Sequence, residues 1–310
     1  MAIVVVGNVF VDVKGFPNDL YIPRGRNSGR VEIVHGGVGR NLAEDIANTE
    51  LRPVFVSMVD DSAEGEDVIR KLQNHKTNVD YVVRVPDGMG MWLAIFDQTG
   101  DIVGSISKRP QMDAMVELLD SRGDEIFRDA DSIVVEIDMD KEIIKRVFKY
   151  ARRYNKRVYA VVANMSIASQ RRDFLQSIDC FVCNEDEAGI LFVSELSELT
   201  PEQLCDELSR RVVSARIPSM VVTMGSRGAV YASMNGDKGV YPARSVMVRD
   251  TTGAGDAFCA GVAIGLTYGK PLREAVEIGT RLAASVITIS ENVCPRFQPR
   301  ELGLDIEVGD

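Results

Sequence analysis

The feature of this chain that most limits its fold is a repeated alternation between short runs of β-branched residues and longer amphipathic stretches. Runs such as IVVV at residues 3–6 and MVVT at residues 220–223 are apolar at nearly every position, as is typical of parallel strands buried on both faces. Strands that alternate with helices form a parallel sheet covered by those helices. The sequence therefore predicts an α/β fold with a mostly parallel central sheet flanked by helices.

The alternation continues along most of the 310 residues. We expect strands at residues 3–6, 54–57, 132–135, 158–162, 180–183 and 220–223. We expect helices at residues 38–48, 64–74, 141–154, 201–213, 254–268 and 272–289. No linker, low-complexity tract or internal repeat interrupts the pattern, so residues 1–310 are predicted to form a single domain.

Two segments, at about residues 13–34 and 82–107, lack the helical period and alternate instead as strands do. In the second, Thr99-Gly100-Asp101 is typical of a turn between two strands. We expect the two segments to form a small antiparallel sheet inserted into the α/β body. A sheet beside the ends of parallel strands could cover a site as a lid.

The chain is acidic, with a formal charge of −10 and an isoelectric point near 4.9. Non-specific binding to nucleic acid or to anionic membranes needs a positive surface, so we expect neither as a partner. The N-terminal MAIVVVGNVF lacks the basic start of a signal peptide, and no apolar run approaches the ~20 residues of a membrane span. Five cysteines, an odd number, suit a reducing compartment. We expect a cytoplasmic protein.

The stretch DTTGAGDAF, residues 250–258, places glycines directly before an expected helix. Gly253 and Gly255 would free the first backbone N–H groups of that helix, including that of Ala254, to bind an anion. Asp256 would then lie in the first turn, where a carboxylate suits a general base that activates a hydroxyl for attack on a phosphoryl group. The alternative is an ordinary glycine-rich turn with Asp256 at a helix start.

The stretch HGGVGRN, residues 35–41, also places glycines before a helix. Asn41 would lie one turn inside, where its amide could bind the hydroxyls of a polyol, whereas Gly37 could equally belong to a plain strand-to-helix turn. Asp12 follows the first strand, at the end of the sheet where open α/β folds bind ligands. Its carboxylate could bind two sugar hydroxyls or could be solvated.

Two further loops follow expected strands. Asn184 and Glu187 have the spacing of a capping box, and Glu187 could also hold Mg²⁺ through water beside a triphosphate. Gly225 and Gly228 could form a loop under a nucleotide or a tight turn.

In their order along the chain, these motifs resemble those of the ribokinase-like, or PfkB, family of sugar and nucleoside kinases. The similarity extends over about residues 2 to 292, and GAGD at residues 253–256 is its most specific part. The resemblance implies a three-layer α/β fold with a β-sheet lid. It also implies phosphoryl transfer from ATP, with Mg²⁺, to a hydroxymethyl group of a sugar or nucleoside.

The resemblance also implies roles for individual residues. Asp256 is the expected catalytic base, and the backbone from Gly253 through Ala254 and Gly255 forms an anion hole. The other implied roles are acceptor binding by Asp12, Gly37 and Asn41, ATP binding by Asn184, Gly225 and Gly228, Mg²⁺ binding by Glu187, and K⁺ binding by Asp250 and Thr252. Lid pairing between subunits is common in this family, so a homodimer is expected.

Within the family, HGGVGRNLAEDIA is most similar to pseudouridine kinases, which makes pseudouridine the leading acceptor. Ribose, fructose, another ketose derivative, 2-keto-3-deoxygluconate and a different nucleoside remain alternatives. Lys108 and Arg109 at the exit of the lid could favour an anionic sugar or could form a solvated edge. Two other classes of function stay open: a sugar- or nucleoside-binding regulator without catalysis, and a nicotinamide-dependent oxidoreductase, although the latter lacks an early GxGxxG.

Overall fold

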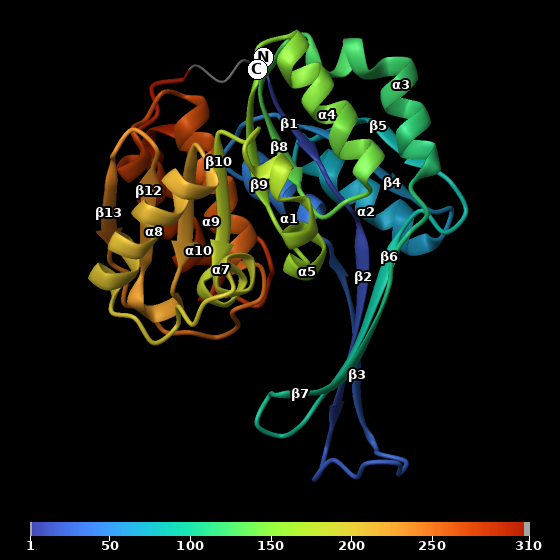
Figure 1. Cartoon of the computed structure of the whole chain (residues 1–310). Coiled ribbons are helices and arrows are strands. Elements are labelled where there is room, and N and C mark those ends of the chain that lie inside the picture. The colour runs from blue at the N-terminus through green and yellow to red at the C-terminus, as the bar shows by residue number, and fades with distance from the viewer. Residues whose placement is uncertain (1, 307–310) are drawn as a thin grey trace.

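A sheet of nine strands forms the centre of the computed structural model, which describes residues 2–306 (Figure 1). Neighbouring strands are parallel except at one edge, where β11, β12 and β13 pair antiparallel. In spatial order the strands are β13 (Lys238–Tyr241), β12 (Ala229–Ser233), β11 (Ser219–Thr223), β10 (Cys180–Asn184), β9 (Arg157–Val161), β8 (Ala130–Glu136), β1 (Ala2–Val6), β4 (Val54–Val59) and β5 (Asn78–Arg84).

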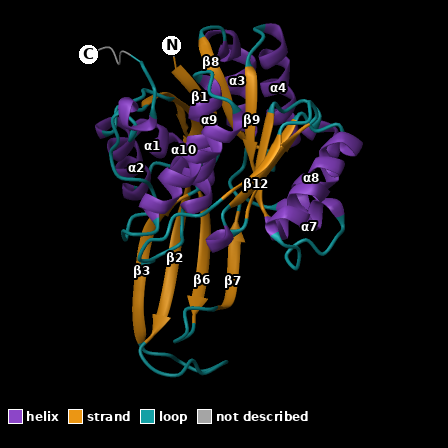
Figure 2. Cartoon of the chain, turned by 90° about the vertical axis from the view of Figure 1, so that its left-hand side faces the viewer, coloured by secondary structure: helices purple, strands orange, loops and turns teal. Residues whose placement is uncertain are grey.

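Helices cover both faces of this sheet, which gives the three layers expected from the alternating pattern (Figure 2). On one face lie α3 (Asp113–Phe127), α4 (Lys141–Arg153), α7 (Glu185–Phe192) and α8 (Pro201–Ala215). On the other lie α1 (Val38–Ala47), α2 (Ala63–Asn74), α9 (Ala254–Thr267) and α10 (Leu272–Val286). The short helices α5 (Met165–Ala168) and α6 (Arg172–Leu175) follow β9. No helix in the described part of the chain is long and apolar enough to cross a membrane.

Side-chain alternation along each strand produces the two hydrophobic cores. In β1, Val4 and Val6 pack under α3 and α4, whereas Ile3 and Val5 pack under α1 and α9. Both sets are almost fully buried, which explains why the strand is apolar at every position rather than at every second one.

A second sheet of four strands projects away from this body (Figure 1). In spatial order it contains β3 (Gly29–Gly36), β2 (Phe10–Pro17), β6 (Gly90–Phe96) and β7 (Ile102–Lys108). The expected turn is present between β6 and β7, where Gly100 has a φ of 89° and its N–H donates to the carbonyl of Asp97. We call this sheet the lid.

The lid differs from the sequence prediction in two respects. Its outer pairs are antiparallel as expected, but β2 and β6 are parallel because both strands leave the body in the same direction. Residues 82–84, which the sequence pattern places in the insertion, belong to β5 of the large sheet, where Val83 packs against the core.

Candidate active site

Gly253 immediately precedes α9 and adopts a left-handed conformation with a φ of 80°. A Cβ at this position would come within 1.9 Å of the carbonyl oxygen of Asn292, so only glycine fits here. Nothing lies within 4 Å of the place where a Cβ of Gly255 would be. The first turn of α9 therefore faces open space, as an anion site at a helix N-terminus requires.

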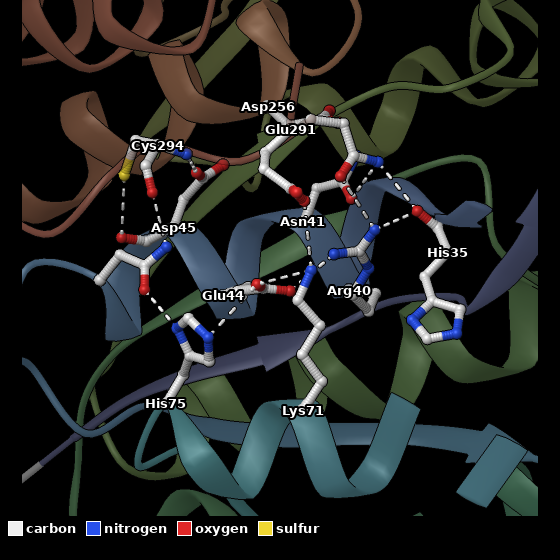
Figure 3. A network of polar contacts seen from close by, with 12 residues as sticks. His35, Arg40, Asn41, Glu44, Asp45, Lys71, His75, Asp256, Glu291 and Cys294 are labelled. Carbon is white, nitrogen blue, oxygen red and sulfur yellow. Dashed lines mark hydrogen bonds and ion pairs between the residues drawn. The ribbon is translucent and has the colours of Figure 1, made fainter. Parts of the chain in front are cut away.

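Asp256 lies in this first turn and contacts a residue 215 positions earlier in the chain. The side-chain amide of Asn41 donates a hydrogen bond of 2.6 Å to Asp256 Oδ2 (Figure 3). Asn41 is in the first turn of α1, which starts after Gly37 with its φ of 97°. The two glycine-rich motifs thus meet at one place, and Asn41 binds the predicted base directly.

Burial is the main cause that raises the pKa of Asp256 to about 6, and the negative charges of Glu187 and Asp12 raise it further. The hydrogen bond from Asn41 and the positive charge of Arg40 act in the opposite direction. A carboxyl group with this pKa is ionised at neutral pH and is more basic than an ordinary aspartate. Both properties suit a general base that operates near neutrality.

Asp12 lies on β2, on the same face of the lid as Trp92 of β6, with which it is in register. Burial raises the pKa of Asp12, although the nearby charges of Lys14 and Arg40 oppose that rise. Trp92 packs edge-to-face with Phe96, at 6.4 Å between ring centroids, and Phe96 stacks on Phe16. This face of the lid combines a carboxylate with an aromatic surface.

A third carboxyl group, that of Glu136, lies buried at the end of β8. It accepts hydrogen bonds of 3.0 and 3.1 Å from the backbone and side chain of Asn8. Burial is the main cause that raises its pKa to about 7, and the charges of Asp138 and Asp256 add to the rise. Sequence reasoning placed Glu136 at the end of a buried run but did not identify it as a neighbour of the site.

A cavity of about 570 Å³ adjoins the start of α9. It is bounded by the loop after β11, by segment 243–251 and by one face of α10. Gly225 and Gly228, predicted to bind ATP, line this cavity together with Ala254 and Gly255. Its mostly apolar lining and its size suit a small organic ligand such as a nucleotide base. Asn184, the third predicted ATP residue, lies outside this lining.

Asn184 and Glu187 form a reciprocal capping box at the start of α7. Glu187 Oε2 accepts from the backbone N–H of Asn184, and Asn184 Oδ1 accepts from that of Glu187, both at 2.8 Å. The cap engages one of the two carboxylate oxygens of Glu187. The structural role considered for this pair is therefore present, and the role at Mg²⁺ stays a prediction.

Asp250 and Thr252 lie in the segment that leads into Gly253. Asp250 Oδ1 accepts a hydrogen bond from the backbone N–H of Thr252 at 2.8 Å. The backbone N–H of Arg249 donates a hydrogen bond to the carbonyl of Ile287. The segment thus runs beside the chain that follows α10, and the K⁺ site stays a prediction. Among the described residues, no cluster of three or more His, Cys, Asp or Glu side chains forms a ready metal site.

Lys108 and Arg109 are both paired with carboxylates. Lys108 contacts Asp87 at 2.7 Å on the surface, and Arg109 contacts the fully buried carboxylate of Asp138 at 2.7 Å. Arg109 also donates to the carbonyl of Asp138. Both cations therefore have a carboxylate partner, as the solvated edge considered for them would have, and an anionic acceptor stays a prediction.

Comparison with known proteins identifies the family. Residues 2–292 match the family described as pfkB family carbohydrate kinase. This chain belongs to that family. It is therefore a kinase that transfers a phosphoryl group to an alcohol, as the order of motifs in the sequence predicted. This finding favours catalysis over the regulator and over the oxidoreductase.

Two relatives and one solved structure illustrate the range of this family. The chain is 33% identical to the guanosine-inosine kinase of Exiguobacterium acetylicum, over 94% of this chain and 95% of that protein. It is 26% identical to the pseudouridine kinase of Escherichia coli, over 88% of this chain and 86% of that protein. The structure of Arabidopsis thaliana ribokinase complexed with ribose and ATP superposes with a TM-score of 0.81 at 22% identity, covering 99% and 100% of the two chains. That likeness confirms the ribokinase-like fold.

Proposed function

We propose that this pfkB kinase phosphorylates the hydroxymethyl group of a nucleoside and that Asp256 is its catalytic base. The observation that carries the proposal is that Asp12 and Trp92 share one face of the lid. The charge of Asp12 also raises the pKa of Asp256, so this face of the lid lies near the proposed base. A carboxylate suits the hydroxyls of a ribose ring, and an aromatic ring suits the face of a base. A free sugar would need only the first of these.

In this mechanism Asp12 and Asn41 bind the ribose hydroxyls, and Gly37 lets the backbone before α1 approach the sugar. Asp256 takes the proton of the hydroxymethyl group as its oxygen attacks the γ-phosphorus of ATP. The bond from that phosphorus to the β,γ-bridging oxygen breaks, and ADP leaves. The N–H groups from Gly253 to Asp256 stabilise the charge that develops on the transferred group.

The ATP would occupy the 570 Å³ cavity, with its base against Gly225 and Gly228 and its phosphates toward Ala254 and Gly255. Asn184 would lie near the phosphates. Mg²⁺ would be held chiefly by phosphate oxygens and, through water, by Glu187. K⁺ would lie beside the anion hole, between Asp250, Thr252 and the backbone that follows α10.

Among nucleosides, guanosine and inosine are the leading acceptors. The guanosine-inosine kinase is 33% identical over nearly the whole chain, against 26% for the pseudouridine kinase. Pseudouridine, which the sequence of the HGGVGRN motif favours, is therefore the second candidate. A larger purine also makes fuller use of the ring of Trp92 as a stacking surface.

The acceptor can be tested by measuring kcat/KM with ATP for guanosine, inosine, pseudouridine, ribose, fructose and 2-keto-3-deoxygluconate. We expect a nucleoside to be preferred, and Trp92→Ala to lower kcat/KM for that nucleoside by about 5- to 150-fold, because base stacking contributes roughly 1–3 kcal/mol. Ribose should be affected little, and Trp92→Phe should retain most of the nucleoside activity. Equal loss for ribose and nucleoside, or a preference for a free sugar, would contradict the proposal.

We also propose that the lid pairs with the lid of a second copy to form a homodimer. The lid face opposite Asp12 carries Val31, Ile33, Leu93 and Ile106, all exposed. A contiguous row of aliphatic side chains on a projecting sheet is typical of a protein–protein interface.

A further inference from the structure

Arg40 is buried beside Asn41, between Glu44 and His35, with 1% of its surface exposed (Figure 3). It pairs with the equally buried Glu44 at 2.6 Å, and Lys71 contacts the other oxygen of Glu44 at 3.3 Å. Burying a charge pair costs desolvation energy, and an apolar pair of similar size often stabilises a fold as well or better. A fold-stabilising role alone therefore explains Arg40 poorly.

Arg40 is linked to Asp256 by a chain of side-chain hydrogen bonds through Asn292. Arg40 Nη2 donates to Asn292 Oδ1 at 3.2 Å, and Asn292 Nδ2 donates to Asn41 Oδ1 at 3.4 Å. Asn41 Nδ2 then donates to Asp256 Oδ2 at 2.6 Å. Because Asn292 accepts from Arg40, its amide nitrogen is turned toward Asn41, and this in turn directs the nitrogen of Asn41 toward Asp256.

The carbonyl of His35 fixes this orientation from the other side. It accepts hydrogen bonds from both Arg40 Nη2 and Asn292 Nδ2. An Asn292 amide turned the other way would set its oxygen against that carbonyl and its nitrogen against a guanidinium, two repulsive contacts. One orientation of the Asn292 amide is therefore strongly favoured.

Asn292 also touches the other part of the site, because its backbone carbonyl lies against Gly253. The chain around it is joined to α1 by two more bonds, from Cys294 N to Asp45 Oδ1 and from Asn48 Nδ2 to the carbonyl of Cys294, both at 2.6 Å. Asn292 thus connects the start of α1 with the start of α9.

We propose that Arg40 and Asn292 are positioning residues, which hold the Asn41 amide so that it donates to Asp256 and keeps that carboxylate oriented for proton transfer. This inference rests on the proposed role of Asp256 as base. Neither residue needs to touch ATP or the acceptor.

The first test is a double-mutant cycle with Arg40→Met, Asn292→Ala and the double variant, assayed by ADP release. If Arg40 acts through Asn292, each single change should lower kcat by about ten- to a hundredfold, as small misplacements of catalytic groups do. The double variant should then be hardly worse than the more impaired single variant. The KM for ATP should change little.

Lys71→Gln is a matched control. Like Arg40, Lys71 is a cation that pairs with Glu44, but Lys71 makes no hydrogen bond to Asn292. The variant should retain kcat within about threefold. Thermal unfolding of every variant checks the fold. If Arg40→Met fails to fold, two substitutions of the partly buried Asn292 test the same chain of hydrogen bonds. Asn292→Ala removes the whole amide. Asn292→Asp is nearly isosteric, keeps the acceptor for Arg40 and loses the donor to Asn41.

The second readout is the dependence of kcat/KM on pH, which a purely structural role would not move. The hydrogen bond from Asn41 lowers the pKa of Asp256, so Asn292→Ala, which removes no charge, should shift the acidic limb of the profile to higher pH by loosening that bond. Arg40→Met should shift the limb further, because the positive charge of Arg40 also lowers that pKa. Lys71→Gln should leave that limb in place. The other charged or titratable groups that interact with Asp256 remain in all these variants: Asp12 on β2, Asp45 on α1, Glu136 on β8, Glu187 on α7 and Cys259 on α9.

Three results would each overturn the proposed positioning role. They are multiplicative losses of kcat in the double variant, an unshifted acidic limb of the pH profile, and an equal loss of kcat in Lys71→Gln. Asp256→Asn, assayed beside these variants, distinguishes the two levels of the argument. If Asp256→Asn is inactive while Arg40→Met and Asn292→Ala are unimpaired, only the positioning role fails. If Asp256→Asn retains full turnover, the proposed base itself is wrong, and the positioning role falls with it.

Discussion

At the scale of the residue, the proposed chemistry centres on one carboxyl group in an unusual environment. Burial and the negative charges of Glu187 and Asp12 raise the pKa of Asp256, while Asn41 and Arg40 lower it and so favour the ionised form. The balance matters because a base must be ionised before the reaction and must hold the proton afterwards. Removing the hydrogen bond from Asn41 or the charge of Arg40 should therefore raise the pKa of Asp256.

The pH dependence of turnover tests this balance. Because the pKa of Asp256 is about 6, kcat/KM should fall as the pH decreases below 6, where the carboxylate becomes protonated. The hydrogen bond from Asn41 lowers that pKa, so Asn41→Ala should move the acidic limb to higher pH in addition to weakening acceptor binding. Initial rates between pH 5 and pH 8, in buffers of constant ionic strength, provide the measurement. A limb that does not move in Asn41→Ala would argue against the contact.

At the scale of the element, the site depends on how α9 begins. Sequence reasoning could identify this start because its cause is local: Gly253, Gly255 and Asp256 lie within four residues of one another. It could not identify the contact of Gly253 with Asn292, or that of Asn41 with Asp256, because these depend on how α1 and α9 pack. Motifs therefore predict where a helix begins, whereas contacts between helices that are distant in the sequence can be identified only in the folded structure.

Gly253→Ala tests the start of α9. Alanine at a φ of 80° costs about 1–3 kcal/mol, and its Cβ would also collide with the Asn292 carbonyl, so the variant should unfold at lower temperature and lose most activity. Gly255→Ala is the matched control for stability, because its Cβ would meet open space and alanine favours a helix by up to about 1 kcal/mol. Thermal unfolding followed by circular dichroism compares them. Equal melting temperatures for the two variants would contradict the assignment.

At the scale of the whole molecule, alternation alone predicted the layered body, because strands buried on both faces have a distinctive composition. It missed α3, whose helical pattern is interrupted by Gly123, a poor helix former that packs against the ring of Tyr150. It also missed β12 and β13, which form a short antiparallel hairpin at the edge of the sheet. These elements exist because of tertiary packing, which their local sequence does not reveal.

The exposed lid face predicts assembly at this scale. Ile33 is 60% exposed and Ile106 is 72% exposed, on the same face of the lid. We expect light scattering to give twice the chain mass of 34.1 kDa and Ile33→Asp to give a monomer, because a buried charge disrupts an apolar interface. Val213→Asp, an exposed aliphatic position on α8, should leave the dimer intact. A wild-type monomer at micromolar concentration would contradict lid pairing.

The role of Asp256 is tested most directly by the turnover of Asp256→Asn with ATP and the preferred nucleoside, measured as ADP release. The substitution preserves size and removes the basic oxygen, so we predict that kcat falls by about a hundredfold or more while ATP and the nucleoside still bind, since general base catalysis contributes roughly 10²–10⁴-fold. Binding of both ligands can be followed by thermal shift on the same sample. Turnover near the wild-type rate would contradict the assignment of Asp256 as the base.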